Sequence, residues 1–142
     1  MTAVQSIAER EREIVEEFAL FDDWFERYEY LIELGESLNK IEDEYKTEAF
    51  RIHGCQSQVW LRPDYRNDKV FFKADSDAAI TRGLVALVVR VLDGLQRSEI
   101  RDARFDFLDD IGMNEHLSPT RKNGLSAMVE QVKNYAREDA SS

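Results

Sequence analysis

The chain has 142 residues, 43% of them hydrophobic, which is enough to bury one core without disulfides or a structural metal. Its 29 acidic and 19 basic residues give a formal charge of −10, which argues against nonspecific binding to nucleic acid or anionic membranes. The single cysteine cannot form an internal disulfide. Together with the two histidines it makes a poor ligand set for zinc or an iron-sulfur cluster. The charged opening is unlike a secretion signal, so we expect one cytoplasmic domain, 1–142, whose partners are proteins or small molecules.

Two amphipathic helices are expected at the start of the chain. Hydrophobic residues recur at helical spacing over 7–21, among Glu and Arg, and predict a helix that ends near Leu20. Asp23, followed three residues later by Glu26, resembles a capping box. A second helix is therefore predicted from about Trp24 to Leu38.

Short strands are expected from Glu48 onward. Phe50 and Ile52 belong to a first short run of aromatic and β-branched residues, and the runs from Gln58 to Arg62 and from Lys69 to Ala74 predict an antiparallel hairpin. The hairpin loop should be long, because four typical turn residues separate the two runs: Pro63, Asp64, Asn67 and Asp68.

The rest of the chain is predicted to be mainly helical. Ser76 or Asp77 is expected to cap a third helix, whose hydrophobic period up to Leu95 is the strongest in the chain and indicates a central position. Three helical segments follow: 98–103, 107–111 up to a break at Gly112, and a last helix that starts at Ser118 and Pro119. Strands and helices in separate runs indicate an α+β fold, with a small antiparallel sheet and helices packed on one face.

One segment is not explained by core packing. Residues 54–60 place a glycine, a thiol and three polar side chains before a strand, which is typical of a loop that presents a side chain. Gly54 permits backbone conformations closed to other residues immediately before Cys55. A thiolate is the nucleophile in sulfur exchange, so Cys55 is the candidate for such chemistry, although an isolated cysteine is more often a small structural hydrophobe.

The loop resembles the signature of the SufE family of sulfur acceptor proteins, including its CsdE-like branch. Positions 54–60 are Gly-Cys-Gln-Ser-Gln-Val-Trp. The resemblance runs roughly from Trp24 to the last helix, and its further matching segments are 75–80, 83–84, 116–121 and 124–125. It implies an α+β fold like that of the scaffold protein IscU.

The resemblance also implies a role. Cys55 would receive sulfane sulfur from a cysteine desulfurase of the SufS or CsdA type, stimulate that enzyme, and deliver the sulfur to a cluster scaffold complex containing SufB. The pyridoxal phosphate cofactor would belong to the desulfurase, so this chain would be an accessory protein without a cofactor. Monomer and homodimer are both open. The other candidates for the loop and for partner contact are Gly54, Gln56, Ser57, Gln58, Asp75, Asp77 and Arg121.

Three charged positions have alternative interpretations. Arg121 opposes the dipole at the start of the last helix, so it either pairs with Asp75 or Asp77, holds the cysteine loop, or contacts the desulfurase. The two aspartates equally fit the positive end of the third helix. His53 is a base or cation for the thiol, or a bystander beyond the break at Gly54.

Two other functions stay open, a metal or cluster scaffold and an interaction module with an inert cysteine. For a sulfur carrier we further expect two states of the loop. At rest Cys55 turns toward an apolar pocket beneath the loop, and partner binding exposes it. Gly54 would act as the hinge, with Val59 and Trp60 anchoring the other side in the sheet.

Overall fold

The computed structural model of the chain describes residues 6–54 and 57–137. The first half contains α1 (Ile7–Ala19), α2 (Trp24–Glu36), the 3-10 helices η1 (Asp43–Tyr45) and η2 (Glu48–Phe50), and the strands β1 (Val59–Arg66) and β2 (Lys69–Ser76). The second half contains α3 (Ala79–Leu92), β3 (Leu95–Gln96), α4 (Arg97–Asp102), α5 (Phe107–Asp110), α6 (Met113–His116) and α7 (Pro119–Arg137).

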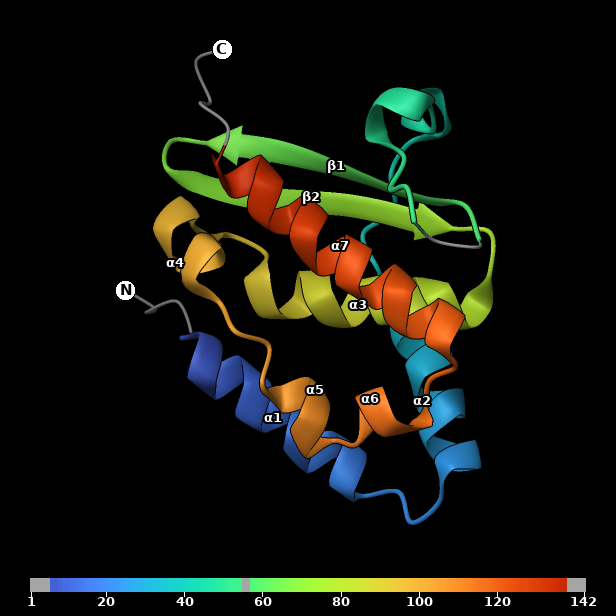
Figure 1. Ribbon diagram of the computed structural model, residues 1–142. Coiled ribbons are helices and arrows are strands. Elements are labelled where there is room, and N and C mark those ends of the chain that lie inside the picture. The colour runs from blue at the N-terminus through green and yellow to red at the C-terminus, as the bar shows by residue number, and fades with distance from the viewer. Residues whose placement is uncertain (1–5, 55–56, 138–142) are drawn as a thin grey trace.

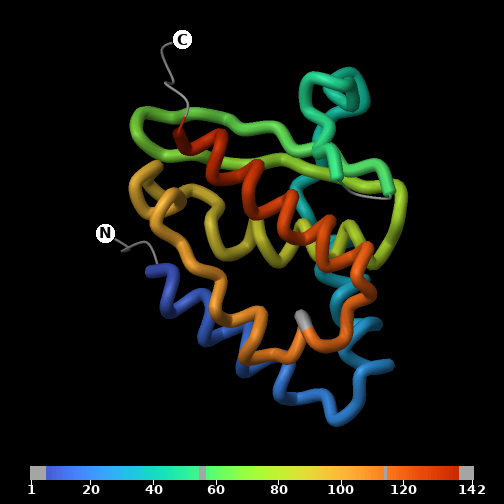
Figure 2. Tube along the Cα trace, in the orientation of Figure 1, coloured from blue at the N-terminus to red at the C-terminus, as the bar shows by residue number. Residues whose placement is uncertain are grey.

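The strands form a three-stranded antiparallel sheet in the order β1-β2-β3, and the helices pack on one face of it (Figure 1). α7 crosses in front of α3 close to the hairpin, while α1 lies beside α5 at the side remote from it (Figure 2). The predicted α+β fold is confirmed. No helix in the described part of the chain is long and apolar enough to span a bilayer.

The predicted helices are confirmed, although several of their ends lie a few residues from the expected positions. Asp23 is the N-cap of α2, and its side chain accepts a hydrogen bond from the Glu26 N–H at 2.8 Å. α3 is central, as its hydrophobic period predicted. The side chains of this helix with no exposed surface are Val85, Leu87, Val88, Val91 and Leu92.

The hairpin is longer, and its turn tighter, than the sequence predicted. β1 continues through Pro63 and Asp64 to Arg66, so that only Asn67 and Asp68 connect the strands. Asn67 takes the left-handed conformation, with φ 59°, that two-residue hairpin turns require. The expected long loop was wrong because β1 is an outer strand of the sheet, where a proline costs no ladder hydrogen bond.

Two further local predictions were wrong. Phe50 belongs to η2 instead of a strand, and Ile52 only donates one backbone hydrogen bond to the Val59 carbonyl, at 2.8 Å. Ser76 ends β2, and the N-cap of α3 is Ala78, which has no side-chain acceptor. The Ser76 hydroxyl instead accepts a hydrogen bond from the Ala78 N–H at 3.2 Å.

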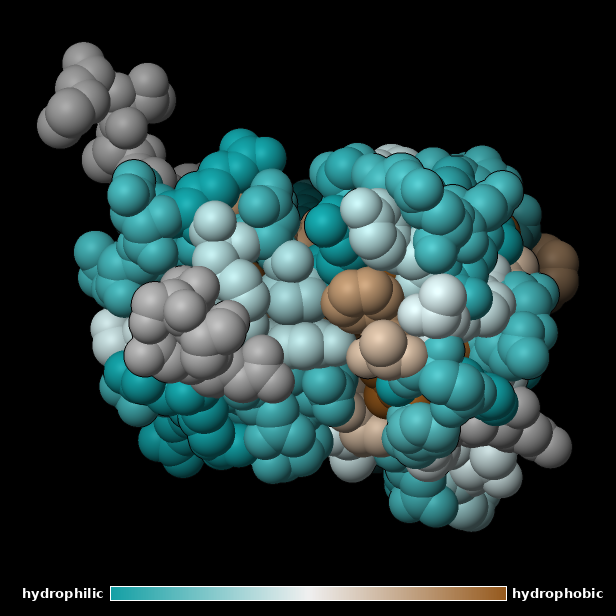
Figure 3. Space-filling model, turned by 90° about the horizontal axis from the view of Figure 1, so that it is seen from above, coloured by the Kyte–Doolittle hydropathy of each residue, from teal (hydrophilic) through white to brown (hydrophobic). Residues whose placement is uncertain are grey.

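The outer surface reflects the charge of the chain. Seen from above, it is mostly hydrophilic, and a small group of hydrophobic residues lies near the middle of the view (Figure 3). Elsewhere, Leu20 and Phe25 are the large hydrophobic side chains that the described residues leave exposed. Single exposed apolar side chains of this kind are common on protein surfaces and need no special explanation.

The backbones of α2 and α3 touch where two glycines face each other. A Cβ atom added to Gly83 would lie 2.3 Å from the carbonyl oxygen of Leu31, and one added to Gly35 would lie 2.9 Å from the Gly83 nitrogen. Contacts this short exclude any side chain, so the two glycines allow a separation of the helices that no other residue would permit.

We expect Gly83→Ala to lower the free energy of unfolding by about 1–3 kcal/mol, because the added methyl group forces α2 and α3 apart. Gly35→Ala should cost less, because its nearest contacts are longer. Urea unfolding of both variants measures the difference. Alanine ordinarily stabilises a helix relative to glycine, so a gain in stability for Gly83→Ala would contradict the close contact.

Candidate functional site

Cys55 and Gln56 lie outside the described residues, so the site is defined by the residues that frame them. The Ile52 N–H donates to the Val59 carbonyl at 2.8 Å, which joins the two ends of the segment at the start of β1. The described residues on either side of Cys55 and Gln56 are therefore held together at the start of β1. The presenting loop at Cys55 itself stays a prediction.

Asp77 holds the second side of the loop. Its Oδ1 accepts a hydrogen bond from the Gln58 N–H at 3.0 Å, and its own N–H donates to the Gln58 carbonyl at 3.3 Å. The predicted cap on α3 was therefore wrong for Asp77 as well. Its carboxylate instead fixes the backbone three residues after Cys55.

Gly54 places the first side of the loop against α7. Its φ of 95° lies in the left-handed region, which is the conformation that its missing side chain permits. A Cβ atom at Gly54 would lie 3.4 Å from the Cβ of Ala127 on α7. One side of the loop is thus bound to the sheet and the other rests on a helix.

Asp75 is a buried ionic centre behind the loop, with only 7% of its surface exposed. Arg82 Nε donates to Oδ1 at 2.8 Å, the Ser76 N–H also donates to Oδ1 at 2.8 Å, and Lys46 Nζ lies 2.9 Å from Oδ2. Burial favours the neutral acid, but the hydrogen bonds from Lys46, Ser76 and Arg82 outweigh it and lower the pKa of Asp75. Asp75 therefore joins β2, α3 and the segment after η1.

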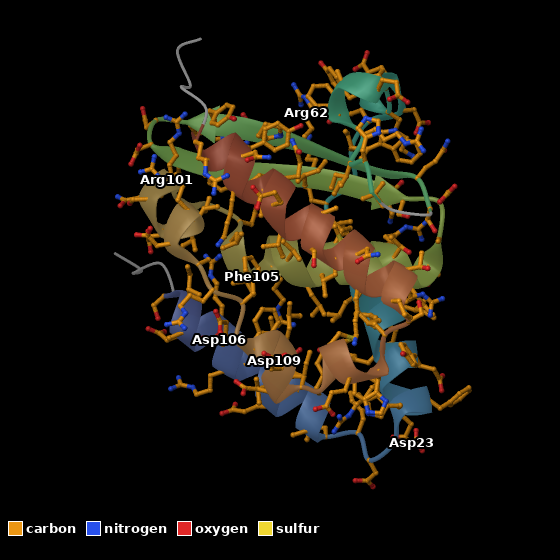
Figure 4. The ribbon with its side chains drawn as sticks, viewed as in Figure 1. Asp23, Arg62, Arg101, Phe105, Asp106 and Asp109 are labelled. Carbon is orange, nitrogen blue, oxygen red and sulfur yellow. The ribbon has the colours of Figure 1, made fainter. Side chains whose placement is uncertain are left out.

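The segment 43–50 is attached to the sheet by cation–ring contacts. The guanidinium carbon of Arg62 lies 3.9 Å from the centre of the Tyr45 ring, and Lys46 Nζ lies 5.5 Å from that of Trp60. Figure 4 shows Arg62 on β1 beside the short helices. These contacts hold Lys46 within reach of Asp75.

Arg121 is not paired with either aspartate. Asp75 and Asp77 are engaged by other groups, and Arg121 contributes its backbone N–H to the Ser118 hydroxyl at 3.3 Å. This bond confirms Ser118 as the cap of the last helix. Over residues 6–54 and 57–137, the structure gives the Arg121 side chain no ion pair or hydrogen bond.

His53 contacts Glu48, and a role toward the Cys55 thiol stays a prediction. Its Nε2 lies 3.4 Å from Glu48 Oε2 in η2, and its side chain is 72% exposed. Exposure in water weakens such a pair. The described residues contain no group of three or more potential metal ligands.

A cavity of about 340 Å³ opens beside the loop, between α2, α3 and α7. Ser57 lies at its edge, two residues from Cys55. Its apolar lining is Ile32, Ile80, Leu84 and Met128, and its other lining residues include Thr81, Thr120 and Arg121. The sequence predicted an apolar pocket beneath the loop, and this cavity lies where that pocket was expected. The turn of Cys55 toward it stays a prediction.

The comparison with protein families agrees with this site. The SufE family, described as an Fe-S metabolism associated domain, matches residues 12–136. The chain belongs to the SufE family. That membership places it in iron-sulfur metabolism and confirms the resemblance found in the cysteine loop.

Relatives in the SufE family are similar over most of this chain. An uncharacterized SufE-like protein of Rhizobium meliloti (strain 1021) is 41% identical over 131 residues, which cover 87% of this chain and 92% of the relative. SufE-like protein 1, chloroplastic/mitochondrial, of Arabidopsis thaliana is 34% identical over 134 residues, which cover 94% of this chain and 36% of that longer protein.

A solved structure shows the same fold. The solution structure of a hypothetical protein from Thermus thermophilus superposes with a TM-score of 0.75 and covers 94% of this chain and 97% of its own. The two sequences are 20% identical, so this likeness concerns the fold alone.

Sequence reasoning missed Lys46 and Arg82 as supports of the site. Arg82 follows Asp75 by seven residues, and Lys46 precedes it by 29. Neither spacing predicts a contact, because a strand end and a helix start separate the first pair and a hairpin separates the second. The burial of Asp75, which makes charged partners necessary, is visible only in the folded structure.

We expect Asp75→Asn to lower the free energy of unfolding by about 1–3 kcal/mol at neutral pH, because Lys46 and Arg82 lose a charged acceptor. A lowered pKa stabilises the fold above the unfolded-state pKa, and this contribution is lost as pH falls through the folded-state pKa. Urea unfolding over an acid series should show the wild-type advantage shrinking as pH falls. Asp22→Asn, at an exposed carboxylate to which the described residues give no ion pair, is the control; a pH-independent difference for Asp75→Asn would contradict the ionic centre.

Asp77→Ala should loosen the cysteine loop without unfolding the protein, because it removes the acceptor for the Gln58 N–H. Hydrogen exchange measures this directly, and the Gln58 amide should exchange roughly tenfold faster if about 1 kcal/mol of hydrogen bonding is lost. Asp77→Asn keeps an acceptor oxygen and should show a smaller change. Equal exchange in all three proteins would show that the side chain does not hold the loop.

Proposed function

We propose that this chain is a sulfur acceptor and carrier for iron-sulfur cluster assembly. Cys55 takes sulfur from the persulfide of a cysteine desulfurase of the SufS or CsdA type and delivers it to a scaffold complex containing SufB. Transfer from the desulfurase stimulates that enzyme by freeing its own cysteine. The chain acts in the cytoplasm as an accessory protein.

The observation that carries this proposal is the position of the cysteine motif in the fold. The chain's single thiol belongs to the segment 54–60, which matches the SufE signature, in a chain that belongs to that family. The loop is bounded by the Ile52–Val59 bond at its base and by Asp77 beside it. A loop attached at its base presents its tip to a partner while the base remains fixed in the sheet.

The transfer step exchanges one sulfur–sulfur bond for another. The Cys55 thiolate attacks the outer sulfur of the desulfurase persulfide, and a new bond forms between that sulfur and Cys55. The original sulfur–sulfur bond breaks, and its electron pair leaves with the desulfurase cysteine as a thiolate. The step needs no added oxidant, reductant or cofactor on this chain. The desulfurase, to which the pyridoxal phosphate belongs, would supply the persulfide before this exchange.

The framing residues have distinct tasks in this proposal. Gln58 and Asp77 fix the second side of the loop, and Asp75 fixes the strand end that carries Asp77. Gly54 gives the first side its conformational freedom, so the loop is able to move about one end. Gln56 and Ser57 complete the surface that meets the desulfurase.

Cys55→Ser should fold normally yet fail to stimulate the desulfurase, because a serine hydroxyl has nearly the same size but cannot form a persulfide. The protein is incubated with a desulfurase and cysteine, and intact mass spectrometry follows the added sulfur. Wild type should gain one sulfur that reductant removes. Ser57→Ala, in the same loop, keeps the thiol and should still be loaded.

Full stimulation by Cys55→Ser would refute the carrier mechanism and favour an interaction module with an inert cysteine. Iron or zinc bound at one equivalent and retained through desalting would instead favour a cluster scaffold. Either result would be recorded on the same preparations.

A further inference from the structure

We propose that the outer face of α2 docks a basic segment of a partner protein, and that a hollow at the start of this face receives one lysine or arginine side chain of the partner. The outer face of α2 is defined by Phe25, Glu26, Glu29, Glu33 and Glu36. It combines carboxylates without partners, a hollow walled by two aromatic rings, and exposed apolar side chains beside that hollow. The surface goes beyond the sulfur-carrier proposal, in which these residues have no task.

The four glutamates of this face form one stripe. Successive members lie three or four residues apart, which places them on the same side of the helix. All four residues are exposed, and the described part of the chain gives their side chains no ion pair or hydrogen bond. At a rise of about 1.5 Å per residue, the stripe from Glu26 to Glu36 is roughly 15 Å long.

The stripe is unfavourable for α2 on its own. Glutamates three or four residues apart on a helix repel one another. Glu33 and Glu36 also lie in the last turn, where the helix dipole disfavours negative charge and α2 has no basic residue to offset it. Lys40, beyond the end of the helix, donates to the Glu36 carbonyl at 3.2 Å and not to a carboxylate. Positive charges of a partner along the stripe would relieve both effects.

A hollow of about 180 Å³ lies where α2 meets the turn that follows α1. Its lining residues are Phe21, Glu26, Glu29, Tyr30 and Glu33, so no basic residue is among the described residues that line it. The ring centres of Phe21 and Tyr30 are 5.1 Å apart, and the Tyr30 hydroxyl donates a hydrogen bond to Glu17, which holds the ring in place. Aromatic rings and carboxylates around one hollow favour a guanidinium or ammonium group.

Leu20 and Phe25 supply apolar contact beside the hollow. Their exposed fractions are 78% and 76%. Leu20 directly precedes Phe21 in the chain, and Phe25 directly precedes Glu26, so each adjoins a residue that lines the hollow. Either side chain alone would be ordinary. Together they offer a partner the apolar burial that ion pairs in water lack, because exposed ion pairs contribute little by themselves.

The charge and shape of this face select a protein segment as its occupant. Nucleic acid and anionic membranes are repelled, and a second copy of this chain carries the same formal charge of −10. The described residues contain no group of three or more potential ligands able to hold a metal ion, since the glutamates are spread along the helix. A helix with lysine or arginine at every third or fourth position, and an apolar residue at one end, matches the stripe in length and charge.

The probe is a synthetic helical peptide of about 15 residues, with lysine or arginine at every third or fourth position and leucines at one end. NMR titration of the full chain at low salt should show saturable shifts at the backbone amides of Phe25, Glu26, Glu29 and Glu33, with an affinity of roughly 10–100 μM. A control peptide of the same composition, with its cations distributed around the whole helix, should bind roughly tenfold more weakly. Equal affinity for the two peptides, or shifts confined to other elements, would overturn the proposal.

Variants separate this face from the general charge of the chain. Glu29→Gln/Glu33→Gln should weaken peptide binding by roughly tenfold, and Phe25→Ala by roughly threefold to tenfold. Glu44→Gln/Asp102→Asn removes the same amount of charge from exposed positions in η1 and α4, and should change binding by less than about twofold. Equal losses in the two double variants would refute the site.

Thermal unfolding checks that the carboxylates do not serve the fold. Because Glu29→Gln/Glu33→Gln relieves repulsion along α2, its unfolding midpoint should equal or exceed that of wild type. A lower midpoint would contradict the argument that the stripe is kept for a partner.

A last arm distinguishes a protein segment from a small polyamine. Spermidine should displace the peptide only at concentrations far above the peptide's own affinity, and displacement at equal concentration would overturn docking of a protein. Figure 4 shows the start of α2, at Asp23, remote from Arg62 and the sheet. Cys55→Ser should therefore bind the peptide as wild type does, so that failed sulfur loading and failed docking are separate outcomes.

Discussion

The contact between the backbones of α2 and α3 determines the position of the cysteine loop. Gly83 lies against the Leu31 carbonyl, in the second turn of α3, and the helix cannot slide there without a clash. Asp77 lies just before the preceding turn of α3 and binds Gln58. A single close crossing of two helices therefore sets both the loop and the cavity beside it.

Ion pairs around Asp75 add to this helix contact in holding the site together. Asp75 draws Lys46 and Arg82 together, and so links a segment from the first half of the chain to the end of β2 and the first turn of α3. Removing Asp75 would take the carboxylate from the partly buried Arg82, which is costly, whereas Lys46 would keep its ion pair with Asp43. Arg121 takes no part in this pairing and lines the cavity, without an ion pair among residues 6–54 and 57–137.

The helices and the cysteine motif were predictable from the sequence because both depend on local order. The period of α3 and the cap at Asp23 are visible within a few residues. The hairpin turn was not predictable from the sequence. Proline is typical of turns, and it fits a strand only at a sheet edge where its nitrogen faces no neighbouring strand, as Pro63 does in β1. The prediction that Ser76 caps α3 failed for a similar reason. Its hydroxyl suits an N-cap, but the residue belongs to β2. The partners of Asp75, Lys46 and Arg82, are distant from it in the chain and could be identified only from the folded structure.

Pro63 also affects how copies of this protein meet one another. β1 is the outer strand of the sheet, and a strand from a second molecule would need a continuous row of N–H and C=O groups to extend it. Pro63 interrupts that row in the middle, and the Tyr135 hydroxyl occupies the Leu61 carbonyl at 3.2 Å. Strand-to-strand stacking, the route by which open sheets become fibrils, is thus hindered along this edge. The same proline that lengthens the hairpin thus protects this edge against self-association.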